Sequence, residues 1–385
     1  MSDNAPLQQV TILGDGCAAL SLAARADEFP GHHFTIVSPK DAPPPQDHIW
    51  GFWGLANGTG ALPSNHNKNI VAAAGMARAS WPKWSIITED DAVVMASSAR
   101  PYHALQRSVW INHCRAEANA ASVAFTDKPP RANDPHTAIF DSRPPQVPNG
   151  MMLQHFTGVE VRVDRPVFDP GTAILMDFRV DQSEGMHFIY LLPFSAQEAL
   201  VESTLFTPHI LQDDFYMTAI HSYLERHYGV TAFETIRRER GVIPLGMLAR
   251  RDAEIPGIGG NGGAIRPSSG YAFIFIQKQI EAALAAVHAD NGRGGLAFQV
   301  PHKSVDLWMD AVFLTVLRNW PDRAPDLFMR MARALSGDQF ARFLSGEAGW
   351  ALRLKVIIAM PKWLFICAVF SFAGLNGRPQ QSGSG

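Results

Sequence analysis

The sequence predicts a mixed α/β fold with three parts, and three observations support the prediction. A β-strand, a glycine turn and an apolar helix follow one another between residues 9 and 26. Four segments rich in β-branched and aromatic residues lie between residues 155 and 204. From about Ser269 the pattern is mostly helical. We therefore expect a Rossmann-like dinucleotide-binding unit, an antiparallel sheet and a helical C-terminal region.

The composition narrows the class of protein. The 385 residues carry a formal net charge of -3 at pH 7, and this balance gives no reason to expect a nucleic-acid partner. Cys17, Cys114 and Cys367 are odd in number and show no CxxC spacing, which suits a reducing compartment without disulfides or structural zinc. The polar start runs directly into the first strand, so we expect no secretion signal.

The first strand, Gln9 to Leu13, leads into the pattern Gly14-x-Gly16-x-x-Ala19. In the dinucleotide fingerprint the first glycine turns the chain, the second lets a pyrophosphate approach, and the third small residue lets the helix pack on the strand. The free amides at the helix start would face the phosphates. The pattern therefore predicts a site for the ADP half of FAD, and the alternative is an ordinary tight turn before a buried helix.

The surrounding sequence favours the cofactor site. An apolar helix from Cys17 to about Ala26 follows the turn, and a second strand runs from Phe34 to Val37. Ser38 replaces the acidic residue that normally ends this second strand and binds the ribose. Either Ser38 hydrogen-bonds the ribose, or Asp41 reaches it.

The next segments connect this unit to the middle of the chain. Residues 41–64 are rich in Pro, Gly and Asn, which predicts a long, ordered loop. A helix is expected from Tyr102 to Ala118. Strands near Ser122 to Phe125 and Thr137 to Phe140 would return to the nucleotide-binding layer.

The middle of the chain predicts the second sheet. Its strands are Phe156 to Val163, Thr172 to Val180, Met186 to Leu192 and Ala199 to Thr204. The expected domains are a discontinuous FAD-binding domain (1–60, 100–150 and 240–290), a substrate-binding part (61–99 and 151–239), a helical part (291–376) and a disordered tail (377–385).

Eight short runs, spread over most of the chain, resemble bacterial lycopene β-cyclases in order and spacing. The resemblance implies a flavoprotein that closes the linear ends of lycopene into β-ionone rings, giving γ- and β-carotene. It implies reduced FAD without net redox change, and NAD(P)H as the reductant of the flavin. The runs are His48–Phe52, Asp141–Pro144, Phe168–Pro170, Leu175–Asp177, Tyr190–Ser195, Leu200–Thr204, Gly241–Pro244 and Gly262–Tyr271.

The same resemblance implies that Glu202, in the run Leu200 to Thr204, carries the acid/base chemistry. The family often has a second carboxylate directly after this acid, where the present chain has Ser203. Cyclisation begins by protonating an alkene and ends by removing a proton from carbon, so one carboxyl group can perform both steps. Alternation places Glu202 with Leu200 and Thr204 on one strand face, and an apolar pocket there would raise its pKa. The alternative is a half-exposed strand residue.

Two further carboxylates lie in the predicted sheet. Asp177 ends an apolar run, so it must be partnered, protonated or at an edge. A second catalytic role and a structural hydrogen bond are its alternatives. Glu160 shares a strand face with Arg162, and an exposed ion pair between them would explain both residues.

A carbocation can be stabilised by aromatic faces and by the charge of an anionic reduced flavin. Trp50, Phe52, Trp53 and Tyr190 are candidate pocket residues, with His48 as a hydrogen-bonding group, and ordinary packing is the alternative for each.

In the run from Gly262 to Tyr271, a helix is expected to start near Ser268. Backbone amides near Gly263, Pro267 and Gly270 would meet the flavin or its phosphates, unless the run is a glycine-rich surface loop. The sequence contains no HExxH and no aspartate-rich motif, so no metal site is expected.

The substrate implied by the resemblance, a linear carotenoid, resides in lipid bilayers. The apolar stretch from Val356 to Phe372 is interrupted by Pro361 and Lys362, which favours surface-lying helices over a membrane crossing. Helices that close the core are the alternative. We expect a cytoplasmic protein peripherally associated with the inner membrane, with no required protein partner. The apolar residues concerned are Trp350, Leu352, Val356, Ile357, Met360, Trp363, Leu364, Phe365 and Phe370, interspersed with Arg353, Lys355 and Lys362.

Two other functions are compatible with the sequence, because a fold alone does not fix chemistry. One is a flavin-dependent hydroxylase or reductase of an isoprenoid substrate. The other is a carotenoid-binding protein without turnover. Product mass distinguishes the hydroxylase or reductase from a cyclase, since cyclisation leaves the mass of the substrate unchanged. Yellow purified protein with an unaltered lycopene pool would indicate the carotenoid-binding protein.

Overall fold

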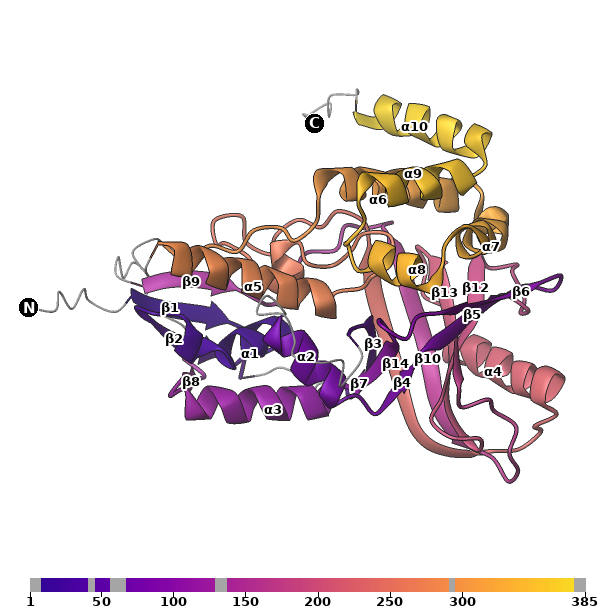
Figure 1. The fold of residues 1–385 in the computed structure, drawn as a ribbon, viewed down its shortest axis with the longest axis horizontal. Coiled ribbons are helices and arrows are strands. Elements are labelled where there is room, and N and C mark those ends of the chain that lie inside the picture. The colour runs from indigo at the N-terminus through magenta and orange to yellow at the C-terminus, as the bar shows by residue number, and fades with distance from the viewer. Residues whose placement is uncertain (1–7, 41–45, 56–66, 129–136, 291–294, 377–385) are drawn as a thin grey trace, which may run out of the picture.

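The computed structural model describes residues 8–40, 46–55, 67–128, 137–290 and 295–376. A four-stranded parallel sheet and a seven-stranded mixed sheet lie side by side, and C-terminal helices cover the mixed sheet on one side (Figure 1). The predicted tail, 377–385, lies outside the described residues.

The parallel sheet has the predicted strand-turn-helix-strand start. Its strand order is β8-β2-β1-β9, and helix α1 packs between α3 and α5 (Figure 1). The helix after the turn ends at Ala23, earlier than predicted, and a short 3-10 helix η1 follows. The elements are β1 (Gln8–Leu13), α1 (Cys17–Ala23), η1 (Ala26–Glu28), β2 (His32–Val37), α3 (Arg107–Ala120), β8 (Ala124–Thr126), β9 (Thr137–Asp141) and α5 (Phe273–Ala289).

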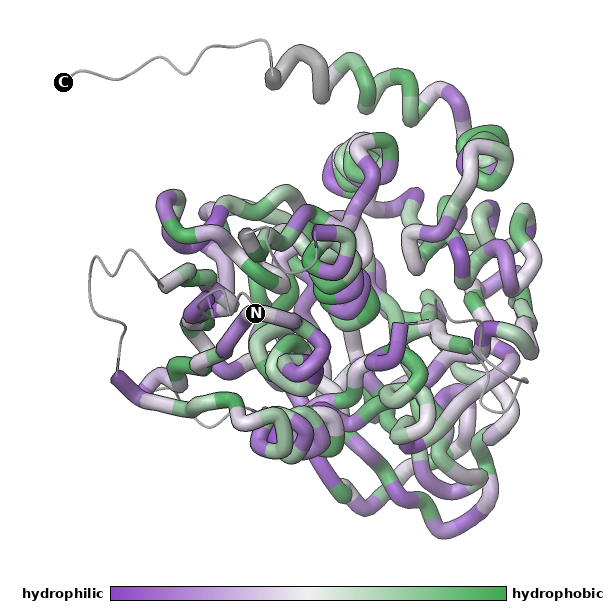
Figure 2. Tube along the Cα trace, turned by 60° about the vertical axis from the view of Figure 1, so that its left-hand side comes forward, coloured by the Kyte–Doolittle hydropathy of each residue, from purple (hydrophilic) through white to green (hydrophobic). Residues whose placement is uncertain are grey.

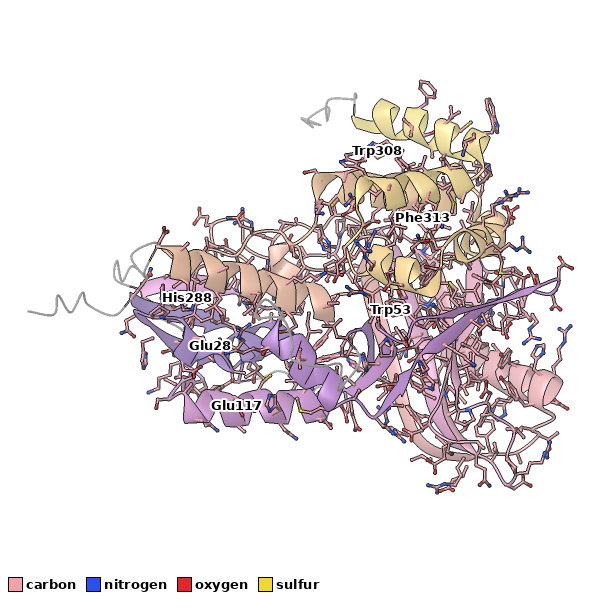
Figure 3. All side chains as sticks on the ribbon, viewed as in Figure 1. Glu28, Trp53, Glu117, His288, Trp308 and Phe313 are labelled. Atoms are coloured by element: carbon pink, nitrogen blue, oxygen red, sulfur yellow. The ribbon has the colours of Figure 1, made fainter. Side chains whose placement is uncertain are left out.

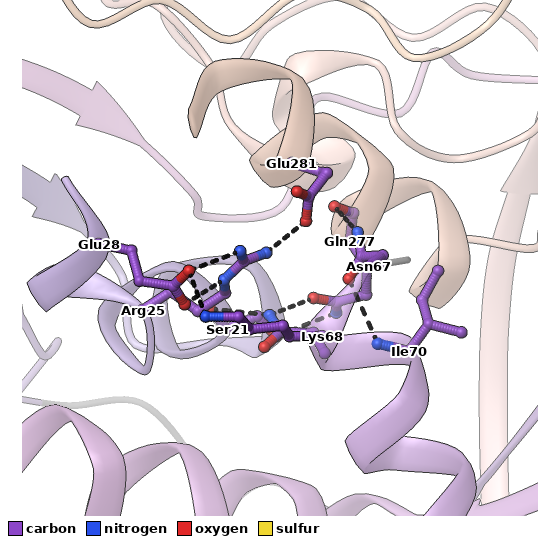
Figure 4. A network of polar contacts seen from close by, with 9 residues as sticks. Ser21, Arg25, Glu28, Asn67, Lys68, Ile70, Gln277 and Glu281 are labelled. Atoms are coloured by element: carbon purple, nitrogen blue, oxygen red, sulfur yellow. Dashed lines mark hydrogen bonds and ion pairs between the residues drawn. The ribbon is translucent and has the colours of Figure 1, made fainter. Parts of the chain in front are cut away.

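A polar network joins α1 to α5 and to α2 (Lys68–Gly75) (Figure 4). Buried Arg25 bonds Glu28 at 2.9 Å and Glu281 of α5 at 2.5 Å. Lys68 adds a contact of 2.8 Å to Glu28. Because the Arg25 charge is paired on both sides, its burial is compensated, and the network fixes the helix that follows the glycine turn.

The mixed sheet contains the four predicted middle strands, and they pair antiparallel as expected. Its order is β14-β10-β13-β12-β11-β5-β6. It is not purely antiparallel, because β5 pairs parallel with β11. Pro244 lies on β14 at the sheet edge, where a residue without an amide hydrogen is tolerated. The strands are β5 (Lys83–Ile87), β6 (Ala92–Ala96), β10 (Met152–Arg162), β11 (Thr172–Asp177), β12 (Met186–Pro193), β13 (Glu198–Thr207) and β14 (Glu234–Leu245).

A third, three-stranded sheet corrects two predictions. It consists of β3 (Ile49–Trp53), β7 (Tyr102–Gln106) and β4 (Ala79–Trp81). Strand β3 lies within the predicted loop, and β7 takes the first five residues of the predicted helix, which starts only at Arg107. In both cases pairing between distant segments, such as Trp53 with Tyr102, overrides the local pattern.

The helical part covers the side of the mixed sheet opposite α4 (Asp213–Tyr228) (Figure 1). A buried ion pair holds α9 to α6, with Arg353 Nε 2.7 Å from Asp306 Oδ1. A second buried pair, between Arg266 and Asp310, ties α6 to the loop before α5. The helices are α6 (Ser304–Asn319), α7 (Ala324–Ala334), α8 (Gly337–Leu344), α9 (Trp350–Ala359) and α10 (Lys362–Asn376).

Candidate active site

A cavity of about 850 Å³ lies where the three parts of the molecule meet. One end reaches Cys17 and Ala18 at the start of α1, and the opposite wall includes Phe328 of α7 and Phe340 of α8. Trp53 of β3 also lines the cavity, and Figure 3 shows it between the mixed sheet and the C-terminal helices. The cavity therefore extends from the glycine turn to one face of the mixed sheet.

Four residues form one row across the mixed sheet, and two of them, Tyr190 and Glu202, line the cavity. Strand pairing places Tyr190 beside Glu202, Glu202 beside Gly158, and Gly158 beside Glu239. A Cβ atom on Gly158 would lie 2.7 Å from Glu202 Cγ and 3.2 Å from Glu239 Cγ. The missing side chain at position 158 thus leaves the space in which the two carboxyl groups meet.

Glu202 is buried and lines the cavity, as the strand alternation predicted for Glu202 and Thr204. Burial raises the pKa of the Glu202 carboxyl well above its usual value, and the hydrogen-bonded carboxyl of Glu239 raises it further. The Arg237 guanidinium opposes the shift. The raised pKa favours the protonated form of Glu202, which is the state that a general acid requires.

Three tyrosine hydroxyl groups meet above Gly51. The Tyr102 hydroxyl lies 2.9 Å from that of Tyr190 and 3.4 Å from that of Tyr271. A Cβ atom on Gly51 would overlap the Tyr102 hydroxyl, so only glycine fits here. Burial raises the pKa of all three phenols well above the usual value, and they stay uncharged. Their rings face the cavity without adding charge to it.

Aromatic rings form much of the wall around Trp53. The centroid of its ring lies 4.7 Å from that of Tyr102, 5.5 Å from that of Tyr271 and 5.7 Å from that of Phe340. All four rings line the cavity. Aromatic faces attract cations, so this wall suits a substrate that becomes positively charged during reaction.

The glycine turn has the geometry that the fingerprint needs. Gly14 adopts φ +95°, and a Cβ atom there would lie 2.9 Å from Ser142 Oγ. Gly16 has no atom within 4 Å of such a Cβ, so open space lies beside it. Ala19 is fully buried between helix and strand. The turn fits a group that approaches the backbone at Gly16.

A carboxylate does lie beside the end of β2. It belongs to Asp15 of the glycine turn and not to residue 38. Ser38 Oγ donates to Asp15 Oδ2 at 3.0 Å, and Arg115 Nη2 donates to the same oxygen at 2.8 Å. Asp15 therefore offers a carboxylate where the fingerprint expects one to meet a ribose. Asp41, the alternative, lies outside the described residues.

The glycine-rich segment before α5 divides between two cavities. Gly270 lines the main cavity, while Gly263 and Pro267 line a neighbouring cavity of about 520 Å³. Helix α5 begins at Phe273, later than the predicted Ser268. The delay follows from a turn closed by Gly270 at φ +68°, whose amide donates to the Arg266 carbonyl.

Four polar atoms in the cavity lining are buried without a hydrogen-bond partner among the described residues: His48 Nδ1, Trp53 Nε1, Thr204 Oγ1 and Ser269 Oγ. Buried polar groups normally have partners, so such atoms mark places for a ligand with hydrogen-bonding groups. A hydrocarbon cannot supply these groups, whereas a flavin can. The residues present therefore fit a bound flavin beside an apolar substrate.

All but one of the predicted pocket residues line the cavity. Trp50, Tyr190 and His48 line the cavity together with Trp53. Phe52 lies behind this wall, with its ring centroid 5.0 Å from that of Phe273.

Asp177 lies away from the cavity lining and is fully buried. Its carboxylate accepts two hydrogen bonds from the Arg179 guanidinium, at 2.9 and 2.6 Å. The hydroxyl of Tyr223 on α4 donates a third at 2.6 Å. This placement matches the structural alternative and separates Asp177 from Glu202.

Replacing Asp177 with Asn should lower the free energy of unfolding by about 2 kcal/mol, because the variant leaves the Arg179 charge without its partner. Urea denaturation measures this change. Cyclisation per folded molecule is the second readout. A loss of cyclisation beyond the loss of folded protein would support the catalytic alternative for Asp177.

The expected exposed ion pair between Glu160 and Arg162 is wrong. Glu160 is buried and bonds Arg78 and Arg237, whereas Arg162 bonds Glu198 at 2.8 Å on the surface. Pairing of β10 with both β13 and β14 places the two residues in these different environments.

Glu239 is the residue near the proposed acid that sequence reasoning missed. No motif in the sequence marks position 239. Strand register brings its carboxyl to Glu202 across Gly158. Among the described residues, no group of three or more His, Cys, Asp or Glu side chains could hold a metal ion.

The fold is shared with FAD-dependent flavoproteins. A geranylgeranyl bacteriochlorophyll reductase-like protein from Thermoplasma acidophilum aligns with a TM-score of 0.53 and 12% sequence identity, covering 91% of this chain and 95% of that chain. A Klebsiella pneumoniae protein, HpxO, solved with FAD and uric acid, aligns with a TM-score of 0.54 at 12% identity, covering 89% and 98%. At such identities the likeness concerns the fold alone.

The chain belongs to the lycopene cyclase protein family, whose model matches residues 9–371. It is 31% identical over 240 residues to the lycopene β-cyclase of Paracoccus sp. strain N81106. That match covers 58% of this chain and 61% of the relative's length.

Proposed function

We propose that this protein is a lycopene β-cyclase that protonates the linear ends of lycopene through Glu202 and closes them into β-ionone rings, giving γ- and β-carotene. The observation that carries the proposal is the buried carboxyl group of Glu202 in an aromatic cavity that adjoins the glycine turn. The family and the Paracoccus relative support the same substrate.

The chain's own residues supply the proton steps. Glu202 donates its proton to a terminal alkene carbon, and the rings of Trp53 and Tyr190 face the tertiary cation that results. The π electrons of a second alkene in the chain attack this cation, which forms the ring C–C bond and moves the positive charge to a ring carbon. Loss of a neighbouring C–H proton to the Glu202 carboxylate then forms the ring double bond. The apolar wall excludes water, which would otherwise trap the cation as an alcohol.

The residues that would hold FAD are those of the glycine turn, Asp15 with Ser38, and the unpartnered atoms of His48 and Ser269. When bound, the anionic reduced flavin supplies a negative charge near the cation. We include NAD(P)H in the proposal as the source of the reducing electrons, which the substrate does not consume.

The proposal is tested by expressing the protein in bacteria that accumulate lycopene and analysing the pigments by chromatography and mass spectrometry. A cyclic product of unchanged mass is expected. A product with an added oxygen or two added hydrogens would instead indicate the flavin-dependent hydroxylase or reductase. An unaltered lycopene pool with yellow purified protein would indicate a carotenoid-binding protein without turnover.

We extend the proposal to binding at a membrane surface, on the cytoplasmic face of the inner membrane. Helix α10 stands at the outer edge of the helical part and is largely hydrophobic (Figure 2). Val356 and Met360 are buried in the core, whereas a second set of apolar residues faces outward. The exposed set is Trp350, Leu354, Ile357, Ile358, Trp363, Ile366 and Phe370.

This geometry favours an interfacial helix pair. Among the described residues no single helix is long and apolar enough to cross a bilayer, and α9 with α10 meets the criteria only as a pair bent by 106°. On α10 the residues Trp363, Ile366 and Phe370 share one face at spacings of three and four. Lys362 caps the end of α9 by donating to the Ile358 carbonyl at 2.6 Å, which stabilises the bend.

Replacing both Trp363 and Phe370 with Ser should weaken binding to phosphatidylcholine vesicles by at least about tenfold, because each large apolar side chain contributes roughly 2 kcal/mol on burial. These side chains are 73% and 74% exposed, so folding should be unaffected. Vesicle co-sedimentation measures the change, with the exposed Val94→Ser of β6 as control. Equal binding by wild type and double variant would contradict the membrane proposal.

A further inference from the structure

A ladder of alternating charges lies next to Glu202. Arg78 Nη1 donates to Glu160 Oε2 at 2.8 Å, and Arg237 Nε lies 3.4 Å from the same oxygen. Arg237 Nη1 in turn lies 2.9 Å from Glu239 Oε2. Two guanidinium groups thus balance the carboxylates of Glu160 and Glu239. None of these positive charges is left to pair with Glu202.

The two oxygens of Glu239 have different environments. Oε2 faces Arg237 and accepts the Ile49 amide hydrogen at 3.2 Å, so it carries the negative charge. Oε1 is buried and has no amide, amine or hydroxyl donor among the described residues. The Glu202 side chain lies next to Glu239 across Gly158, and a proton on Glu202 would supply a donor to this carboxylate. Two ionised carboxylates in this space would repel each other.

We propose that Glu239 is a positioning residue that holds a fixed negative charge beside Glu202, so that Glu202 carries and presents the proton in the resting protein. This inference rests on the proposed function, because it assigns a role toward the proposed acid. Glu239 does not line the cavity and acts only through Glu202.

The paired carboxyls also explain the return of the proton. When Glu202 gives its proton to an alkene carbon, two adjacent carboxylates remain, and their charge stabilises the nearby cation. Their mutual repulsion favours recapture of a proton. A second alkene of the chain attacks the cation and closes the ring with a new C–C bond, which moves the positive charge to a ring carbon. A C–H bond beside that carbon then breaks, its electron pair forms the ring double bond, and its proton returns to Glu202. No oxidant or reductant is consumed.

The tyrosine phenols and the His48 imidazole around this pair stay neutral. Burial raises the pKa of Tyr102, Tyr190 and Tyr271, so these phenols keep their protons. Burial lowers the pKa of His48, which therefore stays uncharged near neutral pH. Arg237 is permanently charged, so the proton that we assign to Glu202 is the one that the experiment follows.

The inference is tested by infrared spectroscopy, which detects the C=O stretch of a protonated carboxyl group and does not depend on turnover. Wild-type protein should show this band at neutral pH, and Glu202→Gln should lack it. In Glu239→Gln the positive charge of Arg237 is no longer balanced. The band should therefore titrate away at least about one pH unit lower than in wild type. The alkaline fall in cyclisation rate should move in the same direction.

Two variants serve as controls. Glu239→Asp keeps the charge and should restore much of the wild-type titration. Glu234→Gln removes an exposed carboxylate from the same strand and should leave the band unchanged. An unshifted band in Glu239→Gln would overturn the inference. If Glu239→Gln shifted the titration of the band but wild-type protein showed no cyclisation, the proposed function would be contradicted. The role of Glu239 toward Glu202 would still be supported.

Discussion

Glu202→Gln should reduce cyclisation by at least about 100-fold, the usual contribution of a positioned general acid. Glutamine has nearly the same shape and can donate an N–H to Glu239, so the row of Tyr190, Gly158 and Glu239 keeps its packing. What it lacks is a transferable proton. The loss should therefore appear in turnover by folded protein, with the thermal unfolding midpoint close to that of wild type.

The measurement is pigment analysis in lycopene-accumulating cells, combined with quantification of soluble protein. Glu198→Gln is the matched control, since it makes the same change on the same strand but affects a surface pair with Arg162. It should leave cyclisation unchanged. Undiminished cyclisation in Glu202→Gln would remove Glu202 from the mechanism.

Gly16→Ala should weaken flavin binding by about tenfold or more while the flavin-free protein unfolds as wild type does. A Cβ atom at this position meets nothing within 4 Å, and its φ of -77° is allowed for alanine. The fold itself therefore has no reason to require glycine here. If a pyrophosphate occupies that open space, the added methyl group must displace it. Each tenfold loss of flavin affinity corresponds to about 1.4 kcal/mol of binding free energy.

Flavin retained per protein after desalting, and titration of flavin-free protein with FAD, measure the effect. Gly75→Ala is the control, because its Cβ also meets open space but lies on α2 away from the cavity lining. Gly14→Ala is expected to behave differently and to lose stability, because its φ of +95° and the Ser142 contact strain any side chain. Full flavin affinity in Gly16→Ala would contradict the assigned cofactor position.

Local patterns in the sequence predicted the parts of the fold that depend on neighbouring residues. The glycine turn from Gly14 to Ala19 has a spacing set by helix geometry, and the structure places it as expected between β1 and α1. Alternation in residues 199–204 correctly gave the face on which Glu202 lies. In these cases the determining contacts lie within a few residues of each other, so periodicity reports them directly.

The sequence by itself thus determined the nucleotide-binding turn, the middle strands and the cavity-facing orientation of Glu202. Only the tertiary structure decided that Glu239 meets Glu202, that Asp177 pairs with Arg179 and Tyr223, and that residues 49–53 and 102–106 form strands. The physical reason is that strand register and helix packing arise from contacts between distant segments. Periodicity gives the side of a strand on which a residue lies, but not the residue that lies beside it on the next strand.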